Sequence, residues 1–170
     1  GLDRTGAEAA ARDLFEGRRC ILTPTTRTAP VARRRVQALW RAVGMRVEAL
    51  PARRHDRLYA QVSHLPQSVA TALVNAANES EAGGRALAYA GTGFRDATRI
   101  AKGSPVVWRD ILLANRSAML AAFDRFSTAL ERLRAAVEAG DADAIEAELR
   151  RASTARRKLD PSRTRRRGAA

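Results

Sequence analysis

Two short segments hold most of the side chains that could bind or transform a small molecule. In the first, SHLPQ, Ser63 and His64 precede a proline and Gln67 closes the segment. A histidine is a candidate for acid–base work because its ordinary pKa lies near neutrality, although a hydrogen-bonded structural role is the simpler interpretation. His55 is the other histidine, and neither has a second His or Cys at ligand spacing. No metal site is therefore expected.

The second segment, FRDATR, carries charge. In a helical turn Arg95 and Arg99 lie on one face, and Asp96 reaches Arg99 three residues on. Guanidinium groups bind carboxylates through paired hydrogen bonds, so one interpretation is a site for a dianionic carboxylate. The other is a solvated charged turn with an Asp–Arg pair. Spacing alone favours this second interpretation.

The SHLPQ segment must be positioned by a long helix. Apolar residues recur from Leu58 to Ala76 at helical spacing and define one stripe. Pro66 lacks an amide donor and clashes with the carbonyl of Val62, so we expect a kink around Ser63–Pro66. A kink frees backbone groups and turns side chains toward a cleft, which makes this a reasonable place for a site.

Residues 1–51 predict an α/β fragment. Two strands do not form an independently stable sheet, so we expect this piece to be the end of a larger sheet. In chain order the expected elements are a helix begun by Thr5-Gly6-Ala7-Glu8 and running through Phe15, a buried strand Arg19–Thr23, a helix capped by Thr28 and running through Val43, and a half-buried strand Met45–Ala49.

From Ala52 onward the pattern predicts helices only. Ser104-Pro105 indicates the start of a helix that continues to about Ala139, and Gly140 ends it. Asp141 can cap a last helix, from Ala142 to about Lys158. The long helix is apolar on more than one face, which favours an intertwined helical dimer over a coiled coil.

Composition narrows the class of protein. The net charge is +13, of which residues 150–170 hold +8, and we expect the end of this basic segment, residues 159–170, to be disordered. A basic nucleic-acid-binding helical protein therefore remains only a minor alternative.

No stretch is apolar enough to span a membrane and no signal peptide is evident, so we expect a soluble, cytoplasmic protein. The single cysteine, Cys20, is interpreted as a small hydrophobic residue.

Both segments occur in order within a longer likeness. HDRLYAQVSHLPQSVATALV, followed by GTGFRDATRIAKGSPVVWRDILLANR, resembles the prephenate dehydrogenase family, whose members show HD…SHLPH and then GGGF(K/R)D(F/T)TRIA…WRDI…N. The opening GLDRTGAEAAARDLFEGRRCILTPT resembles the stretch that follows the family's H-P-x-x-G motif. The resemblance runs from Gly1 to about Asn115.

This resemblance implies a mainly α fold, with a helical dimerisation domain like the C-terminal type of 6-phosphogluconate dehydrogenase after a short remnant of a Rossmann-like domain. Residues 1–51 would be the end of the nucleotide-binding domain, residues 52–158 the substrate-binding and dimerisation domain, and residues 159–170 the tail. It also implies a homodimer.

The family oxidises and decarboxylates prephenate or arogenate with NAD or NADP in tyrosine biosynthesis. By resemblance, Arg99 would bind a substrate carboxylate, and Ser63 and His64 would line the pocket beside the nicotinamide and the substrate ring. Arg95 and Asp96 would help gate that pocket, and Trp108 would pack near it.

Two departures from the family pattern matter. Gln67 replaces the second histidine of SHLPH, which removes a titratable group and could shift preference toward arogenate or allow either substrate. The glycine-rich loop and the catalytic histidine of the family would lie before Gly1, so we expect NAD or NADP to be bound mainly by that part and this chain alone to be inactive. The alternative is a stand-alone, non-catalytic helical dimer that binds an aromatic or dicarboxylate ligand.

Overall fold

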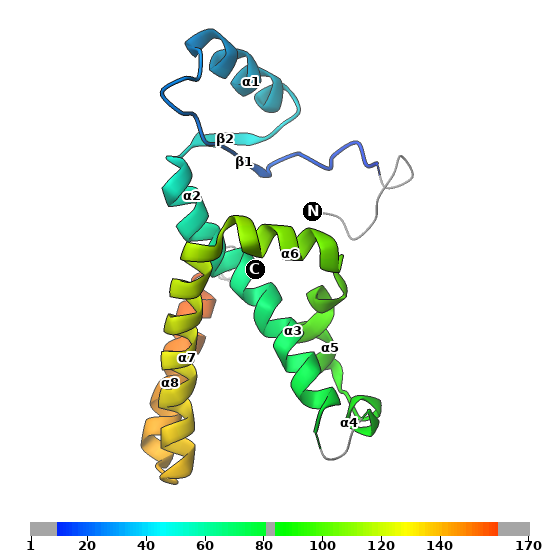
Figure 1. Ribbon diagram of the computed structural model, residues 1–170, viewed down its shortest axis with the longest axis vertical. Helices are drawn as coiled ribbons and strands as arrows, with labels where there is room; N and C mark the ends of the chain where they lie inside the picture. The colour runs from blue at the N-terminus through cyan, green and yellow to red at the C-terminus, as the bar shows by residue number, and fades with distance from the viewer. Residues whose placement is uncertain (1–9, 81–83, 160–170) are drawn as a thin grey trace, which may run out of the picture. The chain divides into compact units, whose positions relative to one another are not determined.

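The structure is mainly α-helical, as expected. The computed structural model describes residues 10–80 and 84–159. Within them, helices predominate and one sheet pairs two strands, β1 (Arg19–Leu22) and β2 (Arg46–Ala49) (Figure 1). The chain divides into two compact units, residues 1–122 and residues 123–170.

The two strands are parallel and joined through helix α1 (Pro30–Ala42). Their register pairs Arg19 with Arg46 at one end and Leu22 with Ala49 at the other. Gly44, with φ of 84°, ends the turn after α1, a conformation that glycine adopts without steric cost. The β-α-β order expected between Arg19 and Ala49 is confirmed.

Two expectations for this fragment are wrong. Residues 12–17 form successive turns, with amides bonded three residues back, instead of a helix through Phe15. Phe15 packs edge-on against Trp40 of α1 with ring centroids 5.5 Å apart, so tertiary contact overrides the local helical pattern. Thr28 does not cap α1, because its hydroxyl accepts the amide of Thr25 at 2.9 Å. The predicted capping box at Thr5–Glu8 lies outside the described residues.

The helix is irregular near the kink expected around Ser63–Pro66, and the irregularity is a π-helical turn that begins earlier, at Ala60. Helix α2 (Ala52–Tyr59) passes into the π-turn η2 (Ala60–His64) and then into α3 (Leu65–Asn78). The amide of Leu65 donates to the carbonyl of Ala60, five residues back, and Pro66 follows with no amide to donate. The missing donor is thereby accommodated by a wider turn.

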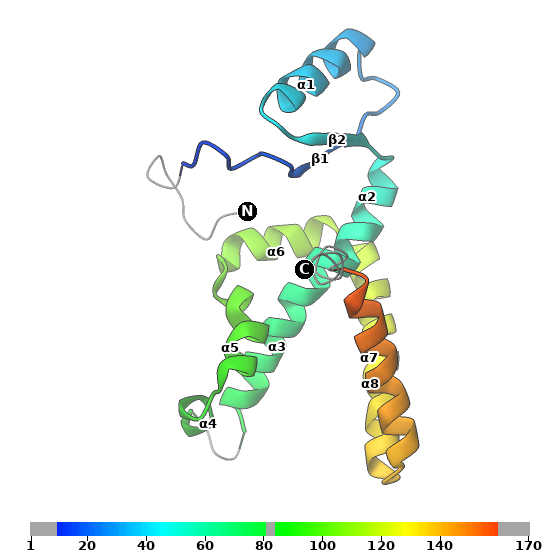
Figure 2. The same ribbon diagram turned by 180° about the vertical axis from the view of Figure 1, so that it is seen from behind.

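Short elements then pack against α3 within the first unit. These are α4 (Arg85–Ala88), α5 (Thr92–Thr98) and the 3₁₀ turn η3 (Arg99–Lys102), followed by α6 (Pro105–Ala114). Figure 2 shows α5 running alongside α3. One cluster of buried residues consists of Ala60, Met119 and Ala122, with Leu65, Leu112 and Ala118 packed against it.

The single long helix expected from Pro105 to Ala139 is wrong. The chain leaves the helical conformation at Asn115, where φ is −109° and ψ is 27°, and α7 (Arg116–Glu138) begins after it. Apolar residues continue on both sides of the break, so their periodicity does not reveal it. Pro105 does begin α6, although the Ser104 side chain makes no capping hydrogen bond.

The second unit contains most of α7 and the last helix, α8 (Ala142–Arg157). Gly140, with φ of 64°, lies in the turn, and the carboxylate of Asp141 accepts the Ala144 amide at 2.9 Å. This capping is as predicted. Arg132 of α7 lies 3.3 Å from Glu148 of α8, an exposed pair that adds little stability by itself.

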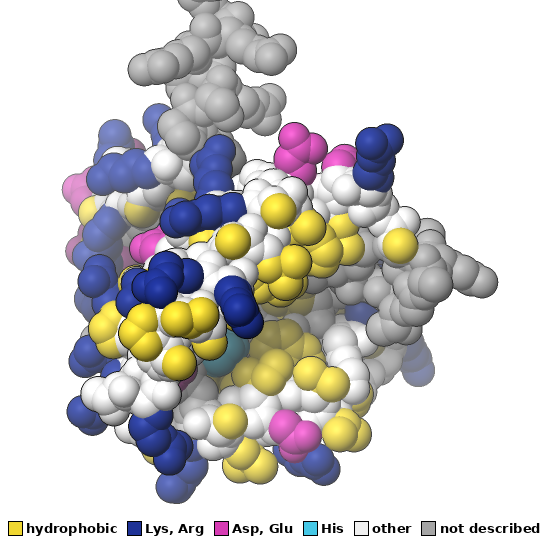
Figure 3. All heavy atoms as spheres, turned by 90° about the horizontal axis from the view of Figure 1, so that it is seen from above, with side chains coloured by type: hydrophobic (Ala, Val, Ile, Leu, Met, Phe, Trp, Pro, Cys, Tyr) yellow, Lys and Arg dark blue, Asp and Glu magenta, His cyan; other side chains and the backbone are white. Residues whose placement is uncertain are grey.

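Many large apolar side chains remain exposed between basic ones, as the yellow and dark blue atoms of Figure 3 show. Leu113 of α6 is 64% exposed and Leu120 of α7 is 51% exposed. Along the described parts of the chain, no helix is long and apolar enough to cross a membrane.

Gly17 and Gly44 lie next to each other, because the Gly17 amide donates to the Gly44 carbonyl at 2.9 Å. Alanine at each position therefore tests backbone strain in the same surroundings. An added Cβ at Gly17, with φ of 67°, meets nothing within 4 Å, whereas at Gly44 it lies 3.2 Å from the Cα of Glu16. We expect Gly17→Ala to lower the free energy of unfolding by about 1–2 kcal/mol and Gly44→Ala to lower it further. Urea unfolding measures the free energy of unfolding of both variants. Equal losses would show that the contact with Glu16 does not destabilise the Gly44→Ala variant further.

Candidate functional site

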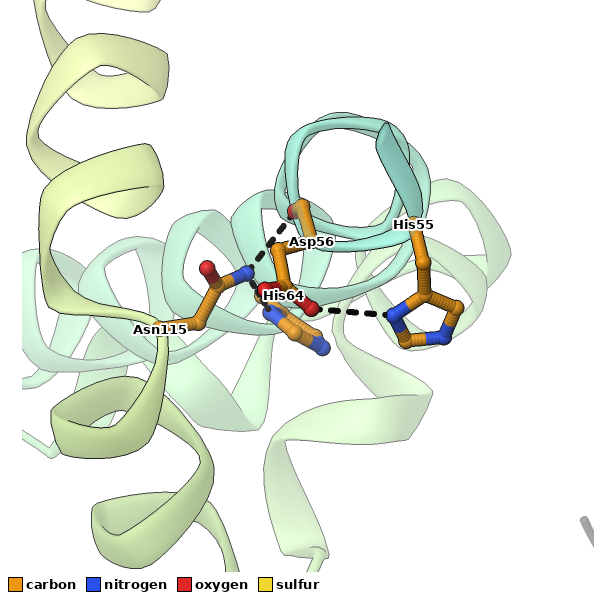
Figure 4. A network of polar contacts seen from close by, with 4 residues as sticks. All are labelled: His55, Asp56, His64 and Asn115. Atoms are coloured by element: carbon orange, nitrogen blue, oxygen red, sulfur yellow. Dashed lines mark hydrogen bonds and ion pairs between the residues drawn. The ribbon is translucent and has the colours of Figure 1, made fainter. Parts of the chain in front are cut away.

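His64 ends the π-turn and lies half-buried among groups from two neighbouring helices. Its Nδ1 is 3.2 Å from Nδ2 of Asn115 (Figure 4). The Trp108 ring from α6 meets the imidazole edge-on, with centroids 6.2 Å apart, and the Tyr59 ring lies 6.5 Å away. The structure therefore brings together two of the predicted site residues, His64 and Trp108.

A second histidine borders this group. Nδ1 of His55 lies 3.0 Å from the carboxylate of Asp56, and the His55 ring stacks on Tyr59 with centroids 4.4 Å apart. The backbone carbonyl of Asp56 accepts a hydrogen bond from Asn115 Nδ2 at 2.8 Å. Figure 4 shows the Asp56 carboxylate directed to His55, while Asn115 reaches His64.

Burial lowers the pKa of His64 below its ordinary value, and the nearby His55 lowers it further, whereas the Asp56 carboxylate acts in the opposite direction. Because desolvation penalises the charged form of an imidazole, burial favours the neutral form of His64. A neutral imidazole has one donor and one acceptor nitrogen.

Ser63 and Gln67 flank His64 along the kinked helix. Ser63 is half-buried in η2. Gln67 lies in the first turn of α3 and is only 4% exposed. Gln67 follows His64 by three residues, so both lie on one side of the helix. A buried amide in the place of the family's second histidine is a fixed polar group that does not titrate.

The charged segment lies on α5 and η3. Arg95 and Asp96 are exposed on α5, Arg99 is exposed at the start of η3, and both elements pack against α3. Nε of Arg95 donates to the Ala90 carbonyl at 3.1 Å, which ties that guanidinium to the turn before α5. The structure thus places the predicted carboxylate-binding segment against the helix that follows His64.

Trp108 approaches the backbone at Gly103. A Cβ added at Gly103 would lie 2.5 Å from Nε1 and 2.9 Å from Cδ1 of the indole. The absence of a side chain at position 103 therefore allows the indole to lie beside the His64 ring.

Asn115 is a site residue that the sequence analysis missed. Its amide contacts two residues that precede it by more than 50 positions, and helical periodicity contains no information about such contacts. A signal was present, because asparagine is a poor residue for a helix interior and it interrupts an otherwise apolar pattern.

No cluster of three metal-ligating side chains is found among the residues that the structure describes. A surface hollow along α8 in the second unit is lined by eight residues that include none of the predicted site residues. The residues around His64 are therefore the candidate site with the most side chains that could bind or transform a ligand.

A family model described as "Prephenate dehydrogenase, dimerization domain" matches residues 51–151, which is more than half of the chain. The chain belongs to the prephenate dehydrogenase family. The match includes both segments singled out from the sequence, and it begins where the α/β fragment ends.

Named relatives support the assignment of the chain to this family. The chain is 34% identical over 145 residues to the cyclohexadienyl dehydrogenase of Zymomonas mobilis, covering 84% of this chain and 50% of that protein. It is 35% identical over 144 residues to the prephenate dehydrogenase of Bacillus subtilis, covering 84% of this chain and 39% of that protein. The chain thus spans half or less of the length of these relatives.

Solved structures agree as well. Prephenate dehydrogenase from Aquifex aeolicus, in complex with hydroxyphenyl propionate and NAD+, superposes with a TM-score of 0.86 at 33% identity, covering 94% of this chain and 56% of that one. Synechocystis arogenate dehydrogenase gives a TM-score of 0.80 at 25% identity, covering 94% and 58%. The mainly helical fold of this family member is therefore shared with these solved dehydrogenase structures.

Gly103→Ala tests the approach of Trp108. The new methyl group would displace the indole, so we expect the fluorescence of Trp108 to change when Trp40 is replaced by Phe in the same background. Gly91→Ala serves as the control, because an added Cβ there meets nothing within 4 Å. Equal spectra for Gly103→Ala and its parent would show that the contact is relieved without moving the ring.

Proposed function

We propose that this chain is the substrate-side and dimerisation part of an enzyme that oxidatively decarboxylates prephenate or arogenate in tyrosine biosynthesis. The observation that carries the proposal is the match of 94% of the chain to a dehydrogenase structure bound to hydroxyphenyl propionate and NAD+. Hydroxyphenyl propionate is an aromatic ring with a carboxylate side chain, which is the kind of ligand that a guanidinium and a half-buried pocket can bind.

The site residues take the following roles in this proposal. Arg99 binds a substrate carboxylate through its guanidinium, Ser63 and His64 line the pocket beside the nicotinamide and the ring, and Trp108 packs against His64. Arg95 and Asp96, on the exposed face of α5, gate the pocket. Gln67 holds a neutral polar group where many prephenate-using relatives have histidine, and we infer a broadened or arogenate-directed preference.

The chemistry demands little of this part of the enzyme. Loss of the ring carboxylate as carbon dioxide makes the ring aromatic, so the protein need only orient the substrate, hold a hydride acceptor and take up the hydroxyl proton. NAD or NADP supplies the acceptor. The sequence contains no glycine-rich dinucleotide loop, and Ser63 is its one candidate for a nicotinamide contact.

The domain assignment follows from the same proposal. Residues 1–51 form the end of a nucleotide-binding α/β domain, which is supported by the parallel β-α-β order from Arg19 to Ala49. Residues 52–158 form the substrate-binding and dimerisation domain, and residues 159–170 the basic tail. The family model over residues 51–151 supports the first boundary.

A homodimer is part of the proposal, because the matched region is described as a dimerization domain and carries exposed apolar side chains. Those of α6 and α7 include Val106, Val107, Leu113, Leu120 and Leu130. Burial of such residues against a second copy would remove apolar surface from water, which is the main favourable term in association.

Arg99→Ala tests the carboxylate site. Loss of a charge-assisted hydrogen bond costs about 1.5–3 kcal/mol, so we expect the affinity for hydroxyphenyl propionate to fall about 10- to 100-fold. Isothermal titration of the complete enzyme measures it. Arg134→Ala is the matched control, since that exposed arginine pairs with Glu131 in the second unit. Equal affinity in the Arg99→Ala variant and the wild type would refute the role of Arg99.

Leu120→Asp tests the dimer. Each copy would place a charge in the interface in place of a side chain worth about 1.5–3 kcal/mol, so we expect the dimer dissociation constant to rise at least about 100-fold. Sedimentation analysis measures it. Leu159→Asp makes the same change at a 72% exposed residue outside the matched region, and we expect it to leave the dimer intact. A Leu120→Asp protein that remains dimeric would exclude this surface.

A further inference from the structure

Asn115 has a defined amide orientation because it contacts the backbone carbonyl of Asp56. That carbonyl is an acceptor, and it already accepts the Ala60 amide at the end of α2. If the Asn115 amide were turned over, its oxygen would face the Asp56 carbonyl at 2.8 Å, and two acceptors would repel. The nitrogen must therefore face Asp56, with one of its hydrogens in that bond.

The second hydrogen of the same amide is then directed at His64. Nδ2 of Asn115 lies 3.2 Å from Nδ1 of His64, within hydrogen-bond distance. A nitrogen that receives a hydrogen bond carries no proton, so the proton of the neutral imidazole must be on Nε2. Figure 4 shows the other ring nitrogen of His64 pointing away from Asn115.

We propose that Asn115 is a positioning residue that fixes His64 as the neutral tautomer with its proton on Nε2, so that His64 offers a hydrogen-bond donor, and not a base, to the ligand.

The backbone holds Asn115 in place for this role. Its own amide donates to the Ile111 carbonyl at the end of α6, and its carbonyl accepts the Met119 amide at 3.0 Å at the start of α7. Met119 is buried against Ala60 in the core of the first unit. The amide of Asn115 is thus fixed to the same cluster that holds the π-turn, so neither partner moves independently of the other.

The surrounding charges agree with this arrangement. The groups that face His64 are His55, Asp56 and Tyr59 from α2, and Trp108 and Asn115 from α6 and the residue after it. The Asp56 carboxylate is engaged by His55 at 3.0 Å, so the partner of the His64 ring is a neutral amide. Protonation of Nδ1 would set an N–H of His64 against the Asn115 N–H, so that two donors would face each other at 3.2 Å.

The consequence for catalysis rests on the proposed function. With its proton on Nε2, His64 can donate to an acceptor oxygen of the bound substrate or nicotinamide, but it cannot take the substrate hydroxyl proton through that nitrogen. The base of the reaction would therefore be a different group, and His64 would serve to orient the ligand.

Nitrogen NMR of the full chain, labelled with ¹⁵N-histidine and without ligand near neutral pH, tests the tautomer directly. The chain has 2 histidines, and the His64 signals are those lost in His64→Gln. We expect an unprotonated Nδ1 and a protonated Nε2. A wild-type spectrum with the proton on Nδ1 would overturn the proposal.

Asn115→Asp reverses the polarity of the contact. A carboxylate would accept from Nδ1, so we expect the proton to move to Nδ1 and the pKa of His64 to rise. Asn75→Asp adds the same charge to an exposed residue of α3, about 16 Å further along the helix, and serves as the control. An unchanged tautomer and pKa in Asn115→Asp would overturn the proposal.

Asn115→Ala keeps the test decisive if the aspartate variant does not fold. It removes the donor without adding charge, so we expect the single tautomer to be replaced by a mixture, and retention of the wild-type pattern would contradict the proposal. Titration of hydroxyphenyl propionate into the complete enzyme reports on the proposed function separately. The expected tautomer without ligand binding would refute that function and leave the role of Asn115 in place.

Discussion

The contact of Ala60 with Met119 and Ala122 is the constraint on which the first unit depends. Ala60 and Ala122 have no exposed surface and Met119 is 2% exposed, so this small cluster joins the π-turn to the start of α7. Small side chains let helices approach closely, and the approach brings the end of α6 to the end of η2. The meeting of Asn115 with His64 is a result of that packing, not of any local preference.

Local physical chemistry predicted most of the fold. Gly44 and Gly140 end helices at positive φ, Pro105 begins one, and Pro66 distorts one, because each restricts its own backbone regardless of its neighbours. The failures lie where tertiary contacts decide. Residues 12–17 form turns beside Trp40, and apolar periodicity continues past the break at Asn115.

The candidate site was predictable in part for the same reason. Ser63, His64 and Gln67 lie together because one helix carries them, and Arg95 and Arg99 because adjoining turns carry them. The partner of His64 was not predictable from spacing, since Asn115 is 51 residues away in sequence. Similarly, the position of Trp108 over Gly103 depends on how α6 leaves η3, which no periodicity describes.

The π-turn is also a place where the length of this chain can vary by one residue. A π-turn holds one residue more than the α-turn that it replaces, so deletion of a single residue within Ala60–His64 would yield a continuous α-helix. A regular α-turn would then span the same stretch of helix, so the residues before the deletion would keep their orientation relative to those after it. His55 and Asp56 would therefore stay on the same side relative to Gln67. One residue can therefore be lost or gained at this turn while the helical segments on either side keep their relative orientation.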